Sequence, residues 1–133
     1  MLVQDLSGKK HTWKLRGYLN NGRTPSKLHV VARDIIKKMF KTMLILEEVT
    51  IPLKIGSVAY LDFYIPLTKT AIEVHGQQHY AYSTLFHSCK MDFVNQQKRD
   101  REKEEWLEIN GLALIKLPFN RIPEWEEILR GNS

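Results

Sequence analysis

The sequence contains a single cysteine, Cys89, among its 133 residues. One thiol cannot form a disulfide within the chain, so a reducing cytosol is the natural compartment. No segment approaches the roughly 18 uninterrupted apolar residues that a membrane helix needs. The opening residues, MLVQDLSGKKH, have no apolar run long enough for a secretory signal. We therefore expect a soluble, cytoplasmic protein with no membrane partner.

Acidic residues are scarce between residues 9 and 41. This stretch holds ten Lys and Arg but one acid, Asp34, although the whole chain has 20 basic and 15 acidic side chains. A concentrated positive face suits a phosphate backbone, and a solubilising surface is the alternative interpretation. Trp13 and Tyr18 favour nucleic acid, because aromatic rings stack on bases. The residues expected to contact DNA are Lys9, Lys10, Lys14 and Arg16.

The chain is long enough for one domain with a hydrophobic core and too short for two comfortable ones. Residues 1–24 show no sustained period and contain the turn-like SGKK and NNGR, which predicts a basic N-terminal arm with little core of its own. Residues 25–133 would form the domain proper. Apolar residues at three-and-four spacing predict a helix over about 25–41, with Thr24 and Pro25 at its N-cap and first position.

Three runs rich in β-branched and aromatic residues follow this helix: MLILEEVTIPL, SVAYLDFYIP and TKTAIEVHG. Their short separators predict an antiparallel meander. A polar helix over about 90–109, a fourth strand at GLALIKLP and a short helix at IPEWEEILR complete the order αβββαβα. The sequence thus predicts an α+β protein of the broad α/β class, with a mixed central sheet of about four strands flanked by helices.

Two carboxylates are expected to face each other in this sheet. Asp62 lies eleven positions before Glu73, and the two segments are joined by a short turn at residues 66–69. In a hairpin, positions symmetric about the turn lie opposite each other. Two adjacent carboxylates repel unless a cation lies between them, and a divalent ion held by oxygen ligands is the usual solution.

Two histidines accompany this pair in the stretch IEVHGQQHY. His75 lies two residues after Glu73, so both side chains should emerge on the same face of the strand. Gly76 allows a sharp turn that would return His79 to the same place. A lone histidine near a strand end is more often structural, but two beside two acids on one face favour a site.

The polar helix supplies an independent indication. Its sheet-facing stripe should consist of Phe93, Gln96, Asp100, Lys103 and Leu107. The middle of that stripe is polar, which is expected only if polar groups of the sheet meet it. The alternative is a slightly rotated helix that turns Val94 and Trp106 inward.

These features resemble the PD-(D/E)XK nuclease superfamily, in which Lys normally stands two positions after the second acid, where this chain has His75. Asp62, His75-Gly76 and His79 are similar to the Vsr-like (very-short-patch-repair) endonucleases. Phage and mobile-element nucleases with an EDxHD-type active site look closer still. The matching residues are Ile72-Glu73, Gly76, Gln78-His79-Tyr80, Gln96, Arg99-Asp100 and Lys103, within a resemblance that covers about residues 25 to 118.

The resemblance implies a restriction-endonuclease-like core and a DNA endonuclease that depends on Mg²⁺ or Mn²⁺. Asp62, with Glu73 or a backbone carbonyl of that strand, would hold the metal. His75 or His79 would accept the proton of the attacking water, since histidine ordinarily titrates near 6.5. Asp100 would orient the imidazole or a metal-linked water, and Lys103 would offset phosphate charge.

Several alternatives stay open at this stage. The chain could be a catalytically inactive DNA-binding module that keeps the nuclease fold, or a hydrolase of a small phosphoester, although the latter would leave the basic arm unused. Such families often place a Glu on the first helix. The candidates here for that remaining group are His29, Asp34, Glu47 and Glu48. A monomer and a homodimer are both compatible with the sequence, and a phage-encoded protein would act in the host cytoplasm.

Overall fold

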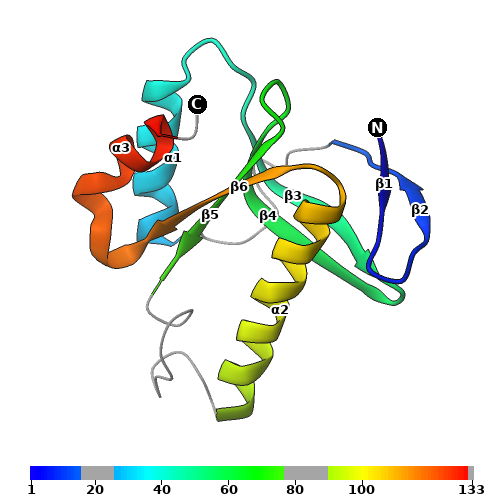
Figure 1. Cartoon of the computed structure of the whole chain (residues 1–133). Coiled ribbons are helices and arrows are strands. Elements are labelled where there is room, and N and C mark those ends of the chain that lie inside the picture. The colour runs from blue at the N-terminus through cyan, green and yellow to red at the C-terminus, as the bar shows by residue number, and fades with distance from the viewer. Residues whose placement is uncertain (16–25, 77–89, 132–133) are drawn as a thin grey trace.

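The computed structural model describes residues 1–15, 26–76 and 90–131 (Figure 1). Its helices are α1 (Lys27–Met39), α2 (Lys90–Ile109) and α3 (Trp125–Arg130), with a 3₁₀ segment at Phe119–Glu124. Its strands are β1 (Leu2–Gln4), β2 (Lys10–Thr12), β3 (Leu46–Lys54), β4 (Ser57–Ile65), β5 (Thr70–His75) and β6 (Ala113–Pro118). From α1 onward the order is αβββαβα, as predicted. Across the described ranges, no helix is long and apolar enough to cross a bilayer.

Strands β3 to β6 form one mixed sheet in the order β3-β4-β5-β6. The first three are antiparallel neighbours, and the turns between them contain Gly56 and Lys69, with φ of 73° and 50°. The chain then crosses over through α2 and returns as β6, parallel to β5. Such a parallel pairing needs a long connection, which the helix provides. The predicted meander, the four-stranded mixed sheet and the α+β class are therefore confirmed.

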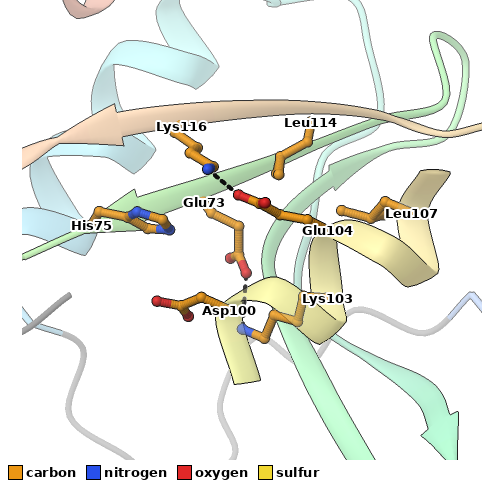
Figure 2. A pocket seen from close by; sticks show the side chains of 8 residues that line it. All are labelled: Glu73, His75, Asp100, Lys103, Glu104, Leu107, Leu114 and Lys116. Atoms are coloured by element: carbon orange, nitrogen blue, oxygen red, sulfur yellow. Dashed lines mark hydrogen bonds and ion pairs between the residues drawn. The ribbon is translucent and has the colours of Figure 1, made fainter. Parts of the chain in front are cut away.

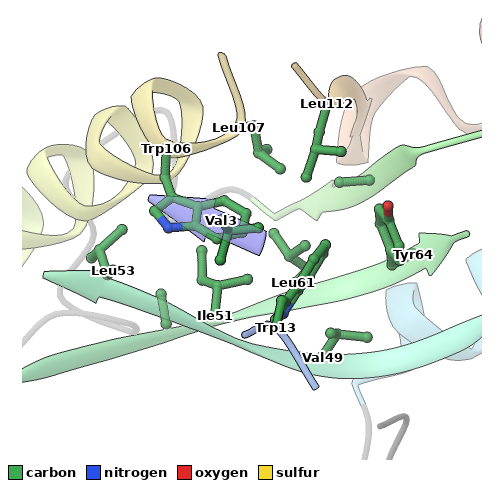
Figure 3. Packing of buried hydrophobic residues seen from close by; sticks show 12 residues of the cluster. Val3, Trp13, Val49, Ile51, Leu53, Leu61, Tyr64, Trp106, Leu107 and Leu112 are labelled. Atoms are coloured by element: carbon green, nitrogen blue, oxygen red, sulfur yellow. The ribbon is translucent and has the colours of Figure 1, made fainter. Parts of the chain in front are cut away.

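The sheet carries a hydrophobic cluster on each face. Phe63 and Tyr64 are consecutive on β4 and belong to different clusters, because successive side chains of a strand point to opposite faces. On the Tyr64 face, α2 and the β1–β2 hairpin contribute Trp106 and Trp13 (Figure 3). On the Phe63 face, α1 and α3 cover the sheet, with Trp125 fully buried. Figure 1 shows α2 on one side of the sheet and α1 with α3 on the other.

The N-terminal segment packs against the domain: the sequence predicted an arm with little core of its own, and its buried residues join the core of the sheet and α2 instead. β1 and β2 pair as an antiparallel hairpin, and Val3 and Trp13 are buried in the α2-side cluster. The expectation that Trp13 stacks on bases is therefore wrong, because its ring packs against Tyr64 and Trp106. The Trp13 indole N–H donates to the Thr50 carbonyl at 2.9 Å, which satisfies a carbonyl of the edge strand β3. Strands of three residues bury too few side chains to show a period. The domain boundary expected at residue 24 lies outside the described residues.

Short polar caps fix the ends of two elements. The N-cap of α1 is Ser26, whose hydroxyl accepts from the His29 N–H at 3.1 Å, so the cap lies two residues after the predicted Thr24. Asp5 holds the β1–β2 turn, because its Oδ1 accepts from the Ser7 N–H at 2.8 Å and the Lys9 N–H at 3.0 Å.

Candidate active site

Asp62 and Glu73 lie side by side where β4 and β5 stop pairing through their backbones. The ladder runs from Ile65 opposite Thr70 to Phe63 opposite Ile72, so the next pair is Asp62 with Glu73, as predicted. At this pair, hydrogen bonds from backbone N–H groups to carboxylate side chains take the place of the backbone–backbone hydrogen bonds between the strands. The Asp62 N–H donates to Glu73 Oε2 at 2.9 Å, and the Val74 N–H donates to Asp62 Oδ2 at 2.8 Å. Both carboxylates are thus fixed by the backbone of the opposite strand.

Helix α2 delivers charged side chains to this pair. Lys103 Nζ donates to Glu73 Oε1 at 2.8 Å, and Asp100 lies one turn earlier on the same face (Figure 2). The part of the predicted stripe that contains Asp100, Lys103 and Leu107 therefore faces the sheet. The alternative in which Val94 turns inward is wrong, because Val94 is 51% exposed. Trp106 is buried as well, so the inward face is wider than the predicted stripe.

Beside Glu73 is a small pocket formed by β5, β6 and α2, and Asp62 is not among the residues that line it (Figure 2). His75 and Glu73 both line it, as expected from their two-residue spacing, and His75 is buried. The other lining residues are Asp100, Lys103, Glu104, Leu107, Leu114 and Lys116. His79, the second predicted histidine, lies outside the described residues, as does Arg16 of the arm.

Burial and the Glu73 carboxylate raise the pKa of Asp62 well above its ordinary value, and the Val74 N–H and the Lys103 ammonium offset this only in part. Burial alone would lower the pKa of Lys103. The carboxylates of Glu73, Asp62 and Asp100 outweigh that effect and raise it instead. Without a metal, Asp62 therefore keeps its proton to higher pH than an exposed aspartate, while Lys103 stays charged.

This shift predicts that Asp62→Asn stabilises the metal-free protein increasingly as pH rises. Below about pH 4, Asp62 is protonated in both the folded and unfolded chains and costs nothing. At higher pH the unfolded aspartate ionises while the folded one resists, so the wild type loses stability until the pH passes the folded pKa. Asparagine avoids this loss and still accepts from the Val74 N–H. We expect its melting temperature to exceed that of the wild type by a margin that grows as the pH rises from about 4 to 8.

Thermal unfolding is monitored by circular dichroism in the presence of EDTA, at several values between about pH 4 and pH 8. Asp34→Asn, on the exposed side of α1, is the matched control and should show no pH-dependent gain. A difference between Asp62→Asn and wild type that is the same at every pH would contradict the assignment.

The four candidates for the remaining active-site group fall in different places. Glu47 is buried on the α1 face, where it accepts from His29 Nε2 at 2.9 Å and from Arg33 Nε at 2.8 Å. Burial opposes these hydrogen bonds, but they prevail and lower the pKa of Glu47. Glu47 and His29 are therefore hydrogen-bonded to each other on the α1 face. Asp34 is exposed on α1.

Glu48 is the candidate in register with the acid pair. Its neighbours Glu47 and Val49 pair with Phe63 and Leu61, which places Glu48 across from Asp62. It adopts the left-handed region with φ of 49°, a conformation that costs free energy in a non-glycine residue. Since Glu73 pairs with Lys116, one row of charged residues crosses all four strands. Its members are Glu48, Asp62, Glu73 and Lys116.

Some residues of the site were not identified from the sequence. Glu104 and Lys116 form an ion pair that closes one side of the pocket (Figure 2). The available signals were weak: Lys116 is the one charge in GLALIKLP, and Glu104 follows Asp100 by one helical turn. The Lys103–Glu73 contact spans thirty positions, and no local pattern reports it.

Comparison with known proteins finds viral relatives of unknown activity. The chain is 36% identical over 64 residues to Uncharacterized protein 033L of Invertebrate iridescent virus 3, a match that covers 48% of this chain and 33% of that protein. It is 39% identical over 59 residues to Uncharacterized protein 307L of Invertebrate iridescent virus 6, covering 44% and 30%. Uncharacterized protein 094L of Frog virus 3 is 38% identical over 65 residues, covering 48% and 42%.

The matched segments are thus less than half the length of each of these viral proteins. No family model matches the chain. No solved structure matches it either.

Proposed function

We propose that this protein is a metal-dependent DNA endonuclease that hydrolyses phosphodiester bonds at the Asp62–Glu73 pair. The observation that carries the proposal is the pair itself: two carboxylates from adjacent strands, fixed by reciprocal hydrogen bonds and met by Lys103 from α2. Buried like charges raise the free energy of the folded state, and function is one reason to keep them. A PD-(D/E)XK-type core of the Vsr-like or EDxHD kind is part of this proposal.

The donor set fits Mg²⁺ or Mn²⁺. Proteins hold Mg²⁺ through one or two carboxylates, and waters complete its shell. Within the described ranges, no group of three or more His, Cys, Asp or Glu side chains is arranged to hold a metal. The ligands in this proposal are Asp62 with Glu73 or a backbone carbonyl of that strand. When bound, the metal would polarise the scissile phosphate and acidify a water.

His75 would take the proton from the attacking water. It lines the same pocket as Glu73, and an imidazole can accept a proton at neutral pH without the large shift that a lysine needs. Asp100, on the facing turn of α2, would orient that imidazole. The predicted role for His79 remains part of the proposal.

The direct test is incubation with supercoiled plasmid in Mg²⁺, in Mn²⁺ or in EDTA. We expect conversion to nicked or linear DNA in either metal and none in EDTA. Salt-dependent binding without cleavage in any metal would instead show an inactive DNA-binding module. Gel filtration would distinguish a monomer from a homodimer. The proposal also includes that the protein acts in the cytoplasm of a host cell.

The basic arm supplies a separate prediction about DNA binding. Lys9, Lys10 and Lys14 are exposed on the hairpin segment, and Arg16 follows it. We expect neutralising all four to glutamine to weaken binding about equally for any sequence. Each lost phosphate contact lowers the log-log salt slope by about 0.9 on duplex DNA, so the slope should flatten by up to roughly three to four units. Single-turnover cleavage at saturating protein should change much less.

The control is a triple lysine-to-glutamine variant on α1, at Lys27, Lys37 and Lys38, which removes similar charge from another surface. Fluorescence anisotropy across a salt series gives both slopes. An unchanged slope with a lower melting temperature for the arm variant would show that its cations are merely solvated.

A further inference from the structure

Lys103 already engages one of the two carboxylate oxygens that Glu73 would offer to a metal. Its ammonium donates to Glu73 Oε1 at 2.8 Å, while Oε2 accepts from the Asp62 N–H. Both oxygens of Glu73 are therefore engaged. The side chains of Lys103 and Glu73 are only 18% and 6% exposed, so this is a largely buried ion pair rather than a loose surface contact.

We infer that Lys103 is an internal counter-ion that holds Glu73 until a divalent cation displaces it, an inference that rests on the proposed metal site. An ammonium and a divalent cation on one carboxylate repel each other, and partial burial strengthens that repulsion. The Lys103 ammonium at Glu73 Oε1 should therefore weaken metal binding there until it moves away.

Other acceptors are available to the Lys103 ammonium once it leaves Glu73. Lysine carries its charge on a flexible four-carbon stem, so the head group can move while α2 stays fixed. Asp100 lines the same pocket one turn earlier and attracts the Lys103 charge. A phosphate oxygen of bound DNA would be a second acceptor. The other lysine that lines the pocket, Lys116, forms its ion pair with Glu104.

The test is isothermal titration of Mg²⁺ into metal-free protein without DNA. Lys103→Met keeps the apolar stem and removes the charge, and Lys103→Arg keeps the charge. We expect Lys103→Met to bind Mg²⁺ about 10- to 100-fold more tightly than wild type, the range by which groups beside metal ligands change affinity. Lys103→Arg should not gain affinity. Lys54→Met removes a lysine paired with Glu102 of α2 at 2.7 Å, outside the pocket, and should match wild type.

A crystal structure with Mg²⁺ provides a readout independent of affinity, because the Lys103 ammonium should then lie beyond hydrogen-bond distance of Glu73. Equal or weaker binding by Lys103→Met, with wild type still binding, would overturn the inference and leave the metal site intact. Absence of Mg²⁺ binding by wild type and Lys103→Met alike would overturn both. If Lys103→Met melts below the titration temperature, Lys103→Gln replaces it with the same expectation.

Discussion

Asp62→Ala protein should leave supercoiled plasmid intact in Mg²⁺, with cleavage reduced by about 10³-fold or more. A metal contributes several kcal/mol of transition-state stabilisation, and each 1.36 kcal/mol is tenfold in rate. Loss of one of two carboxylate ligands should forfeit most of that. The fold should survive, because the deletion also removes a carboxylate that repels Glu73. Gel assays at several protein concentrations, with circular dichroism of the same samples, measure both effects.

Two companion variants separate a metal role from a structural one. Asp62→Asn keeps the acceptor for the Val74 N–H and removes the ligand charge, so it should be as inactive as Asp62→Ala. Asp34→Ala deletes an exposed carboxylate of α1 and should cleave at the wild-type rate. Full cleavage by either Asp62 variant would exclude this residue from the site.

His75→Lys should lower cleavage by roughly 10²- to 10⁴-fold at pH 7 and recover part of it at high pH. Lys103 already brings a cation to Glu73, so a second positive group at position 75 adds little that the pocket lacks. A lysine there can accept a proton only when it is neutral, which requires high pH or a strongly lowered pKa. A pH–rate profile in single turnover measures this.

His75→Gln provides the contrast, because glutamine can hydrogen-bond but cannot accept the proton at any working pH. Its loss should match that of His75→Lys at pH 7 without recovery at high pH. Near wild-type activity of His75→Lys at pH 7 would mean that the position serves only as a positive group beside the phosphate.

Local patterns were sufficient for the sheet, for α2 and for the acid pair. Alternating and β-branched residues define β3 to β5, and a short turn places positions symmetric about it opposite each other, so Asp62 and Glu73 could be paired from their spacing. His75 could be placed beside Glu73 because a strand repeats every two residues. The pairing of Asp62 with Glu73 and the placement of His75 beside Glu73 each span fewer than a dozen positions.

Relations over longer distances could not be predicted in this way. Lys103 contacts Glu73 because the crossover connection between β5 and β6 packs α2 against the sheet beside β5. Glu48 lies opposite Asp62 in the β3–β4 register, between two residues whose partners are known. Its left-handed backbone could not be predicted, because a glutamate rarely adopts that conformation. Val3 joins the core from a three-residue strand and Trp13 from the position directly after another, and both strands are too short to show a period.

The docking of the N-terminal hairpin has a consequence for the order of folding. Trp13 reaches Thr50 across 37 positions, and Gln4 exchanges two hydrogen bonds with the Asn110 side chain across 106. Contacts so distant in sequence are closed late, because chain entropy must be lost before they repay it. The β3–β4 hairpin and α2 can form from local contacts, and so can the β1–β2 hairpin, but its docking requires both of the others. We therefore expect the β1–β2 hairpin to dock onto the domain late in folding, after α2 and the β3–β4 hairpin have formed.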